Sequence, residues 1–150
     1  MAADMILDGK RVPRCFQLME TWSDGVVENI SAIPMALWLE RHSAGATPRN
    51  IGVTIAGDDD IQCLADLLDH IPFVALHLPK FTDGRVYSHA FRLRRLWNYS
   101  GTILMTGDVL RDQLIYMSRC GVNAFYMREG QDVDASLAAF NLFSGYYQYN

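Results

Sequence analysis

From residue 51 onward the sequence alternates between short, almost wholly apolar runs and longer segments with helical periodicity. Four runs have the length and composition of buried strands: 51–56, 73–78, 102–106 and 123–127. Strands that are apolar on both faces are typical of a parallel sheet whose strands are connected by helices. The alternation therefore predicts an α/β fold with four mainly parallel strands. It is compatible with a half (β/α) barrel and with an open doubly wound sheet.

The segments between these strands predict helices, each opened by a side chain that can cap it. We expect helices from Asp59 to about His70, from Ser88 to Trp97, from Asp108 to a stop at Gly121, and from Asp134 through Phe143.

The first 47 residues follow a different pattern. Asp8-Gly9 predicts a β-hairpin because both residues tolerate the positive φ of a tight turn. A second turn is expected at 23–27 and a short helix at 33–42. Because 47 residues are too few for a core of their own, we expect one domain, residues 1–150. It comprises an N-terminal hairpin and helix (1–47) and a β/α core (48–150).

Composition narrows the class of protein. Hydrophobic residues make up 50% and charged residues 20%, which is typical of a globular chain. No apolar run approaches the ~20 residues that span a bilayer. The N-terminus does not resemble a signal peptide, and Cys15, Cys63 and Cys120 are widely spaced, without a CxxC pair. We therefore expect a cytoplasmic protein without membrane contact, disulfides or a metal site.

The charges are distributed unevenly. Residues 80–119 contain seven basic and three acidic residues, a net charge of +4, whereas the rest contains six basic and 14 acidic residues, a net charge of −8. A basic segment on an acidic protein argues against nucleic-acid binding and suits a small anion or an acidic partner surface. Arginine accounts for eleven of the 13 basic residues and is well suited to binding oxyanions. A solvated helix face is the alternative.

The candidate site lies where ligands bind in parallel α/β proteins, beyond the C-terminal ends of the strands. After the second strand we expect an anion-binding loop formed by Lys80, Asp83, Arg85 and Ser88. Lys80 and Arg85 supply charge, Asp83 orients Arg85, and Ser88 caps the next helix. The alternative is a turn held by an ion pair between Arg85 and an aspartate.

After the third strand, Asp108 and Asp112 are candidate catalytic carboxylates, and Arg111 and Gln113 are candidate ligand-binding residues. Helix capping and salt bridges are the alternatives for the two aspartates. His77 lies inside an apolar strand and is expected to be a core histidine, and Cys120 is expected to be buried. No P-loop, GxGxxG, HExxH or GxSxG motif is present, so a nucleotide phosphate loop is not expected, and the sequence leaves the cofactor unknown.

Two blocks of the sequence resemble a known family. Residues 78–88, with Ala90 and Leu93-Arg94, look like the first signature of the bacterial family called domain of unknown function 934. Residues 107–114, with 119–121 and 124–125, match its second signature. Members are typically encoded beside assimilatory sulfite reductase genes and are often labelled probable oxidoreductases. The resemblance therefore implies a role in sulfur assimilation, with the sulfite reductase system as a possible partner.

Two functions follow as hypotheses. The first is an accessory or anion-binding protein of assimilatory sulfite reduction, whose basic rim binds a small oxyanion or an acidic partner. The second is an enzyme, an oxidoreductase of sulfur assimilation, with its site in the same rim and a carboxylate as general base. The uncharged tail 140–149 contains two Phe and three Tyr, which predicts a homodimer or a tail folded onto its own core.

Overall fold

The computed structural model describes residues 3–22, 27–28, 30–46, 48–80 and 82–144. Within these ranges the strands form one eight-stranded sheet in the order β2-β1-β8-β7-β6-β5-β4-β3. Their bounds are β1 Asp4–Leu7, β2 Lys10–Pro13, β3 Gln17–Leu18, β4 Ser31–Pro34, β5 Gly52–Ile55, β6 Phe73–Leu78, β7 Thr102–Gly107 and β8 Ala124–Phe125. From β3 to β8 the neighbours are parallel, whereas β1 is antiparallel to both β2 and β8.

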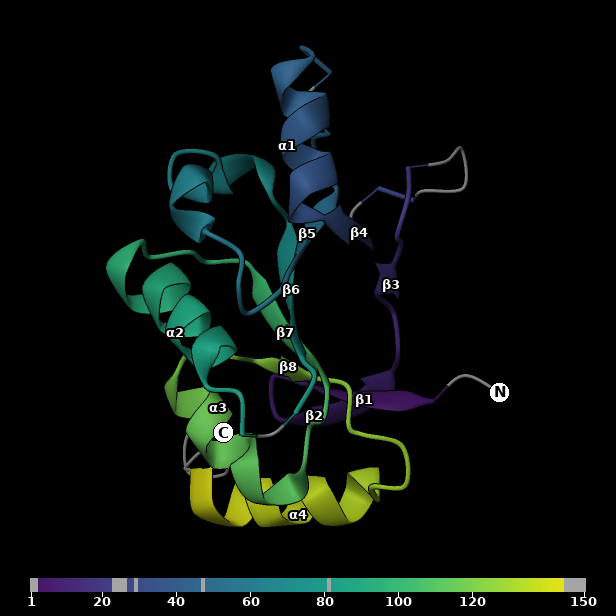
Figure 1. Ribbon diagram of the computed structural model, residues 1–150. Helices are drawn as coiled ribbons and strands as arrows, with labels where there is room; N and C mark the ends of the chain where they lie inside the picture. The colour runs from purple at the N-terminus through teal and green to yellow at the C-terminus, as the bar shows by residue number, and fades with distance from the viewer. Residues whose placement is uncertain (1–2, 23–26, 29, 47, 81, 145–150) are drawn as a thin grey trace.

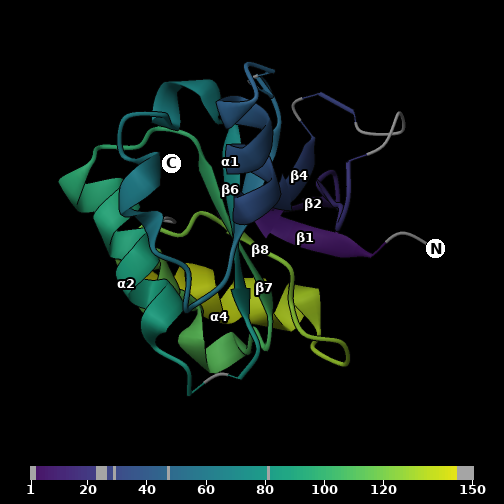
Figure 2. The same ribbon diagram turned by 45° about the horizontal axis from the view of Figure 1, so that its top comes forward.

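The parallel strands follow one another in the sheet in the same order as in the sequence. An open doubly wound sheet reverses this order at a switch point, and here the order does not reverse. Successive right-handed crossovers place their helices on one face, and the sheet curls away from them. Figures 1 and 2 show the helices around one side of the curled sheet. The predicted α/β fold is confirmed, in its half-barrel form.

The N-terminal region extends both edges of this sheet. The predicted hairpin is confirmed: Asp8 and Gly9 form its turn with φ of 51° and 79°, and β1 pairs with β8. At the other edge β4 pairs with β5, and β3 pairs with β4. The predicted helix at 33–42 begins later, because β4 takes Ile33 and Pro34 into the sheet and α1 spans Met35–Ser43. The predicted turn at 23–27 lies mostly outside the described residues.

The predicted helix from Asp59 to His70 is wrong. The segment forms two short 3-10 turns, η1 at Ile61–Leu64 and η2 at Leu68–His70. Ile61, Leu64 and Leu68 are buried as expected, but the spacing of three between Ile61 and Leu64 fits a 3-10 turn as well as an α-helix, and Leu68 begins the second turn. The remaining helical elements are α2 Arg85–Phe91, η3 Arg92–Leu96 (a π-helix), η4 Arg111–Gln113, α3 Leu114–Arg119 and α4 Val133–Ser144.

The predicted helix caps are wrong in each case, by one to four residues. Asp60, not Asp59, caps η1 by accepting a hydrogen bond from the Gln62 amide. Helix α2 begins three residues before Ser88, because Asp83 accepts a hydrogen bond from the Arg85 amide and opens the helix there.

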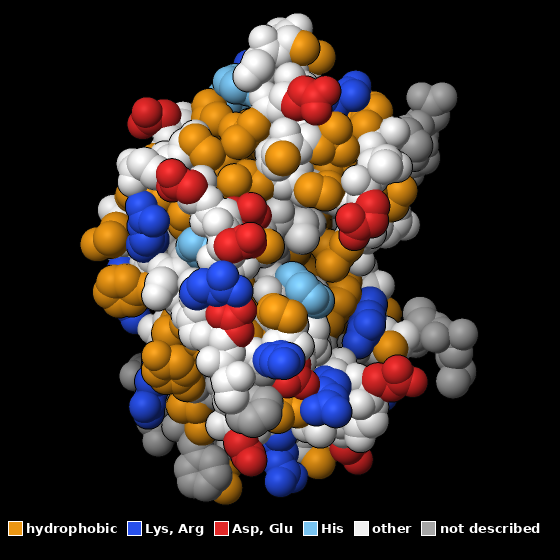
Figure 3. Space-filling model, viewed as in Figure 1, with side chains coloured by type: hydrophobic (Ala, Val, Ile, Leu, Met, Phe, Trp, Pro, Cys, Tyr) orange, Lys and Arg blue, Asp and Glu red, His pale blue; other side chains and the backbone are white. Residues whose placement is uncertain are grey.

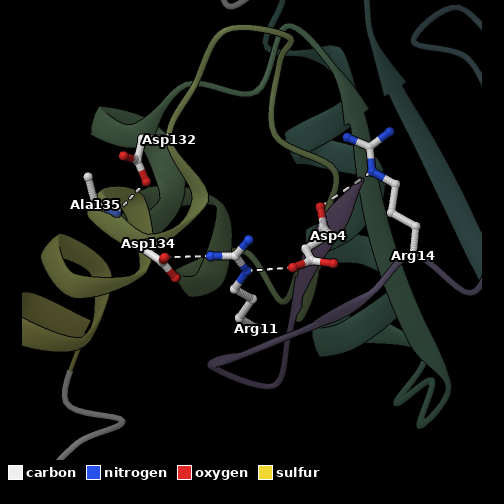
Figure 4. Close-up of polar contacts among 6 residues, drawn as sticks. All are labelled: Asp4, Arg11, Arg14, Asp132, Asp134 and Ala135. Atoms are coloured by element: carbon white, nitrogen blue, oxygen red, sulfur yellow. Dashed lines mark hydrogen bonds and ion pairs between the residues drawn. The ribbon is translucent and has the colours of Figure 1, made fainter. Parts of the chain in front are cut away.

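The same holds for the last two helices. Asp108 does not cap a helix. It lies in a bend, Leu110 after it is extended, and the Val109 carbonyl accepts a hydrogen bond from the Arg128 amide. Asp132, not Asp134, accepts the hydrogen bond from the Ala135 amide at the start of α4. Figure 4 shows this contact. The predicted stop at Gly121 is confirmed, with a φ of 110°.

Hydrophobic side chains form one cluster on each face of the sheet. The larger cluster lies between the sheet and the helices and includes Trp38, Leu76, Leu93 and Phe125. The smaller cluster lies on the inner face, opposite the helices, and comprises Met5, Ala32, Phe73, Ala75, Leu104 and Ala124.

The inner face is covered by residues 14–16, which we call the crossing segment. This segment leads from β2 at one edge of the sheet toward β3 at the other, along the side opposite the helices (Figure 1). The Phe16 ring lies 4.3 Å from the Phe73 ring, and the backbone of Phe16 exchanges two hydrogen bonds with the Tyr126 hydroxyl. The chain thus buries its inner face itself.

This arrangement bears on the predicted dimer. A half barrel whose inner apolar face lay bare would favour a second copy, but here the crossing segment covers that face. Phe140, the first residue of the aromatic tail, packs against Phe125 in the chain's own core. Residues 145–150 lie outside the described part of the chain, so the dimer stays a prediction. No helix in the described ranges is long and apolar enough to cross a bilayer.

Candidate functional site

Two cavities lie at the C-terminal ends of the parallel strands, and we call them together the trough. The first, the basic arm, has a volume of about 560 Å³ and is lined by two arginines, Arg14 and Arg128, and by Asp4, Glu129 and Tyr126 among others. The second, the apolar arm, has a volume of about 400 Å³. Thr106, near the end of β7, lines both arms. The space-filling view shows histidine, basic and acidic side chains beside hydrophobic ones on one face of the molecule (Figure 3).

The sheet register determines which side chains reach the trough. Phe73, Ala75 and His77 alternate along β6 toward the inner face, and His77 is paired in register with Thr106 on β7. On β5, Thr54 is paired with Ala75 and therefore also faces inward. Beyond these residues the crossing segment no longer covers the sheet, so His77 is exposed. The prediction of a buried core histidine at His77 is wrong for this reason.

The His77 ring contacts Thr106. Its Nδ1 lies 3.2 Å from the Thr106 hydroxyl, and that hydroxyl also lies 3.5 Å from the Leu76 carbonyl. Which partner receives the hydroxyl hydrogen depends on the tautomer of the ring. The imidazole lines the apolar arm next to Thr106, the residue that both arms share.

Arg14 carries an unneutralised charge in the basic arm. Its guanidinium donates to the backbone carbonyls of Asp4 and Met127, at 3.4 and 3.3 Å, and lies 4.4 Å from the centre of the Tyr126 ring. Within the described ranges no carboxylate forms a salt bridge with it. The Asp4 carboxylate instead pairs with Arg11, which also pairs with Asp134 (Figure 4). Arg14 is therefore available to bind an anion.

Arg128 provides a second guanidinium at the same arm. One of its nitrogens lies 3.0 Å from the carboxylate of Asp108, a candidate catalytic residue. The Arg128 side chain is 56% exposed and that of Asp108 is 16% exposed. The remaining donors of the Arg128 fork can reach a ligand while the pair is kept. Asp108 thus holds Arg128 at the rim, next to Gly107 and Thr106.

The residues expected to bind a ligand are placed in two separate groups. The loop after β6 contains Lys80, Asp83 and Arg85. Arg85 donates to Asp83 through two nitrogens at 3.0 and 2.8 Å, which is the ion pair considered as the alternative to an anion site. Ser88 lies inside α2, and Lys80 is exposed.

The second group lies around η4. Arg111 and Asp112 approach to 3.7 Å, are both exposed, and line a third cavity of about 320 Å³ against Gln131 at the start of α4. Gln113 is the last residue of η4. Gln131 also lines the basic arm, so this cavity adjoins the trough.

The ion pair between Asp83 and Arg85 predicts how the stability of the protein depends on pH. Hydrogen bonds and the charge of Arg85 lower the pKa of Asp83 from 3.8 to about 2. Since the folded pKa is the lower one, the pair stabilises the protein above about pH 4, and this contribution is lost as the pH falls toward 2. We expect a carboxyl titration by NMR to place Asp83 near pH 2, and Arg85→Ala to return it toward 3.8. A wild-type value near 3.8 would contradict the pair.

Sequence reasoning missed the residues that line the trough. Arg14 and Arg128 lie outside the basic segment 80–119, and Thr54, His77 and Thr106 were read as strand residues. One signal in the sequence could have identified three of these residues. Thr54, His77 and Thr106 are polar residues near the ends of otherwise apolar strands. No sequence signal places Arg14 there, since it arrives through the crossing segment.

The cysteines lie outside the lining of the trough, and the described residues form no metal site. Cys120 is buried, as predicted, and burial raises the pKa of its thiol. The three cysteines are free, with Cys15 and Cys63 exposed. Across the described ranges no group of three or more His, Cys, Asp or Glu side chains is arranged to hold a metal ion.

Comparison with known proteins gives one match. No curated protein and no solved structure matches the chain. The model of a family described as "Bacterial protein of unknown function (DUF934)" matches residues 52–150. This range begins at β5, covers more than half of the chain, and contains both blocks on which the resemblance rested. The chain therefore belongs to the bacterial DUF934 family.

Proposed function

We propose that this protein binds a small anion with a sulfite-like head group in the basic arm, as an accessory protein of assimilatory sulfite reduction. The observation that carries the proposal is Arg14, whose guanidinium, among the described residues, contacts two backbone carbonyl oxygens and an aromatic ring and forms no salt bridge. A cation without a carboxylate partner at the open end of parallel strands favours an anionic ligand. The association with sulfite reduction is supported by the family resemblance alone.

The basic arm is a better candidate than the loop after β6. The Arg85 fork is already occupied by Asp83, and an added anion would compete with that carboxylate. Arg14 forms no salt bridge within the described ranges, although Asp4 and Glu129 line the same arm, and the Asp4 carboxylate is paired with Arg11. Arg128 and Thr106 also line this arm. We assign the primary anion contact to Arg14 and an outer, weaker role to Lys80 and Arg85.

A second candidate function is an enzyme of the same pathway. The observation that favours it is His77, an exposed imidazole that lines the apolar arm and contacts Thr106. A histidine in such a position can serve as a general base. In this case His77 replaces Asp108 and Asp112 as the base, because Asp108 is bonded to Arg128 and Asp112 is exposed at the third cavity.

The proposal predicts the response of one variant. Replacing Arg14 with alanine removes a charged donor, so we expect sulfite to bind about 10-fold more weakly, measured anaerobically by calorimetry. Binding should also weaken as salt rises. Arg92→Ala is the matched control: Arg92 is exposed and contacts Gln62 and Trp97.

Three further measurements make the result decisive. Arg14→Lys keeps the charge and should retain part of the affinity. Thermal melts should show that both Arg14 variants fold. Arg85→Ala should lose less affinity than Arg14→Ala. Equal affinity in the wild type, Arg14→Ala and Arg92→Ala would exclude the basic arm as an anion site.

A further inference from the structure

We infer that the ligand is an organic anion, with an acidic head group in the basic arm and a short apolar body in the apolar arm. The inference rests on the proposed function, because Arg14 anchors the head group in both. It adds the chemical class of the ligand. A bare oxyanion is then an incomplete ligand for this trough.

The dimensions of the trough support an extended ligand. The apolar arm has about 400 Å³ and the basic arm about 560 Å³, and sites of 300–1,000 Å³ are typical for organic ligands. Sulfite or sulfate would occupy a small part of the basic arm and leave the apolar arm unused. Because Thr106 lines both arms, one molecule can lie across it.

The lining of the second arm is mostly apolar. Six apolar residues line it, from the ends of β3, β4 and β5 and from the start of α1: Leu18, Met19, Pro34, Met35, Ala36 and Ala56. Leu18 is 38% exposed. Covering these side chains removes apolar surface from water and favours a hydrocarbon or thioether body. An inorganic ion gains nothing from this surface.

Polar groups in the apolar arm limit what the body can carry. The Thr54 hydroxyl is buried and, among the described residues, has no hydrogen-bond partner. Buried hydroxyls normally have one, so Thr54 together with His77 suits a single neutral polar group on the body. Glu20 and Asp59 also line this arm, and their negative charge disfavours a second acidic group. The ligand class is thus an anion with one acidic end.

The experiment is a chain-length series. We would titrate ¹⁵N-labelled protein with sulfite, methanesulfonate, butanesulfonate and hexanesulfonate, following the Thr54, Thr106 and Arg14 amides. In a half-open arm each methylene should raise the affinity about twofold, so hexanesulfonate should bind about 30-fold more tightly than methanesulfonate. Butane-1,4-disulfonate should bind more weakly than butanesulfonate. Carboxylates of equal length distinguish a sulfonate head from a carboxylate head.

A blocked variant separates the two arms. Ala36 is exposed and lies in the first turn of α1, so Ala36→Phe fills the arm without entering the core. We expect it to abolish the gain in affinity with chain length, so that hexanesulfonate binds the variant no more tightly than methanesulfonate does. Ala44→Phe is the matched control, because Ala44 is exposed at the other end of the same helix and does not line the arm.

The outcomes separate this inference from the proposed function. If affinity is independent of chain length but falls in Arg14→Ala, the inference is wrong and the anion site stands. If no sulfonate or oxyanion responds to Arg14→Ala, the proposed function fails and the inference fails with it. If affinity rises with chain length in the wild type and in Ala44→Phe but not in Ala36→Phe, the result supports both the anion site and the organic ligand.

Discussion

Replacing Gly107 with alanine should lower the free energy of unfolding by about 3 kcal/mol or more, a large part of the 5–15 kcal/mol that a domain of this size has. Gly107 ends β7 with a φ of 96°, a conformation that L-residues rarely adopt. An alanine Cβ would also lie 2.2 Å from the Leu78 carbonyl oxygen. That oxygen belongs to the backbone of the neighbouring strand and cannot move aside without breaking the sheet.

Gly130 is the control that separates the backbone strain of a positive φ from the steric overlap with the Leu78 carbonyl. Gly130 has a similar φ of 90°, but no atom lies within 4 Å of its added Cβ. Gly130→Ala should therefore show only the conformational cost, about 1–2 kcal/mol. Urea denaturation followed by circular dichroism measures both variants. Equal losses in the two would show that the Leu78 carbonyl does not restrict Gly107. Because Gly107 lies between Thr106 and Asp108, a folded Gly107→Ala should also have a distorted trough.

Replacing Arg94 with methionine should lower the free energy of unfolding by about 2–4 kcal/mol. The Arg94 guanidinium donates to three backbone carbonyls, those of Tyr99, Gly101 and Gly121, at 2.6 to 3.0 Å. It therefore connects η3 with the chain entering β7 and with the turn before β8. Methionine keeps most of the apolar stem but leaves those carbonyls without this donor.

Arg95 provides the control, since it is exposed and donates to the Arg119 carbonyl at 3.3 Å. Arg95→Met should change the stability by about 0.5 kcal/mol or less. Similar losses at both positions in thermal and urea denaturation would mean that overall charge, and not the carbonyl network, explains the effect of Arg94. Arg94→Met should leave the affinity for sulfite unchanged under conditions where it folds, because Arg94 does not line the trough.

These contacts change the interpretation of the basic segment 80–119. Its local net charge of +4 suggested one anion-binding rim, but its arginines have several separate roles. Arg85 is paired with Asp83, and Arg94 binds backbone carbonyls. Arg14, the trough arginine that forms no salt bridge within the described ranges, lies outside the segment 80–119. Local charge density in a sequence counts cations without showing which of them already have partners.

The sequence alone determined the α/β core, because buried parallel strands must be apolar on both faces and their crossovers must carry a helical pattern. It also determined the hairpin at Asp8-Gly9, whose turn is encoded by two adjacent residues, and the stop at Gly121. It located the strand ends where a ligand is expected. In each case the cause lies within a few residues of the feature.

Only the tertiary structure decided the rest, because its causes lie far apart in the chain. Helix capping at Asp108 is replaced by pairing with a distant part of the chain, because the Val109 carbonyl accepts a hydrogen bond from the Arg128 amide. The two-residue strand β3 has no stability of its own and depends on pairing with β4. Arg14 reaches the trough through hydrogen bonds that join Phe16 to Tyr126, 110 residues away. Contacts at such separation leave no periodic signal in the sequence, so the trough became visible only in the folded chain.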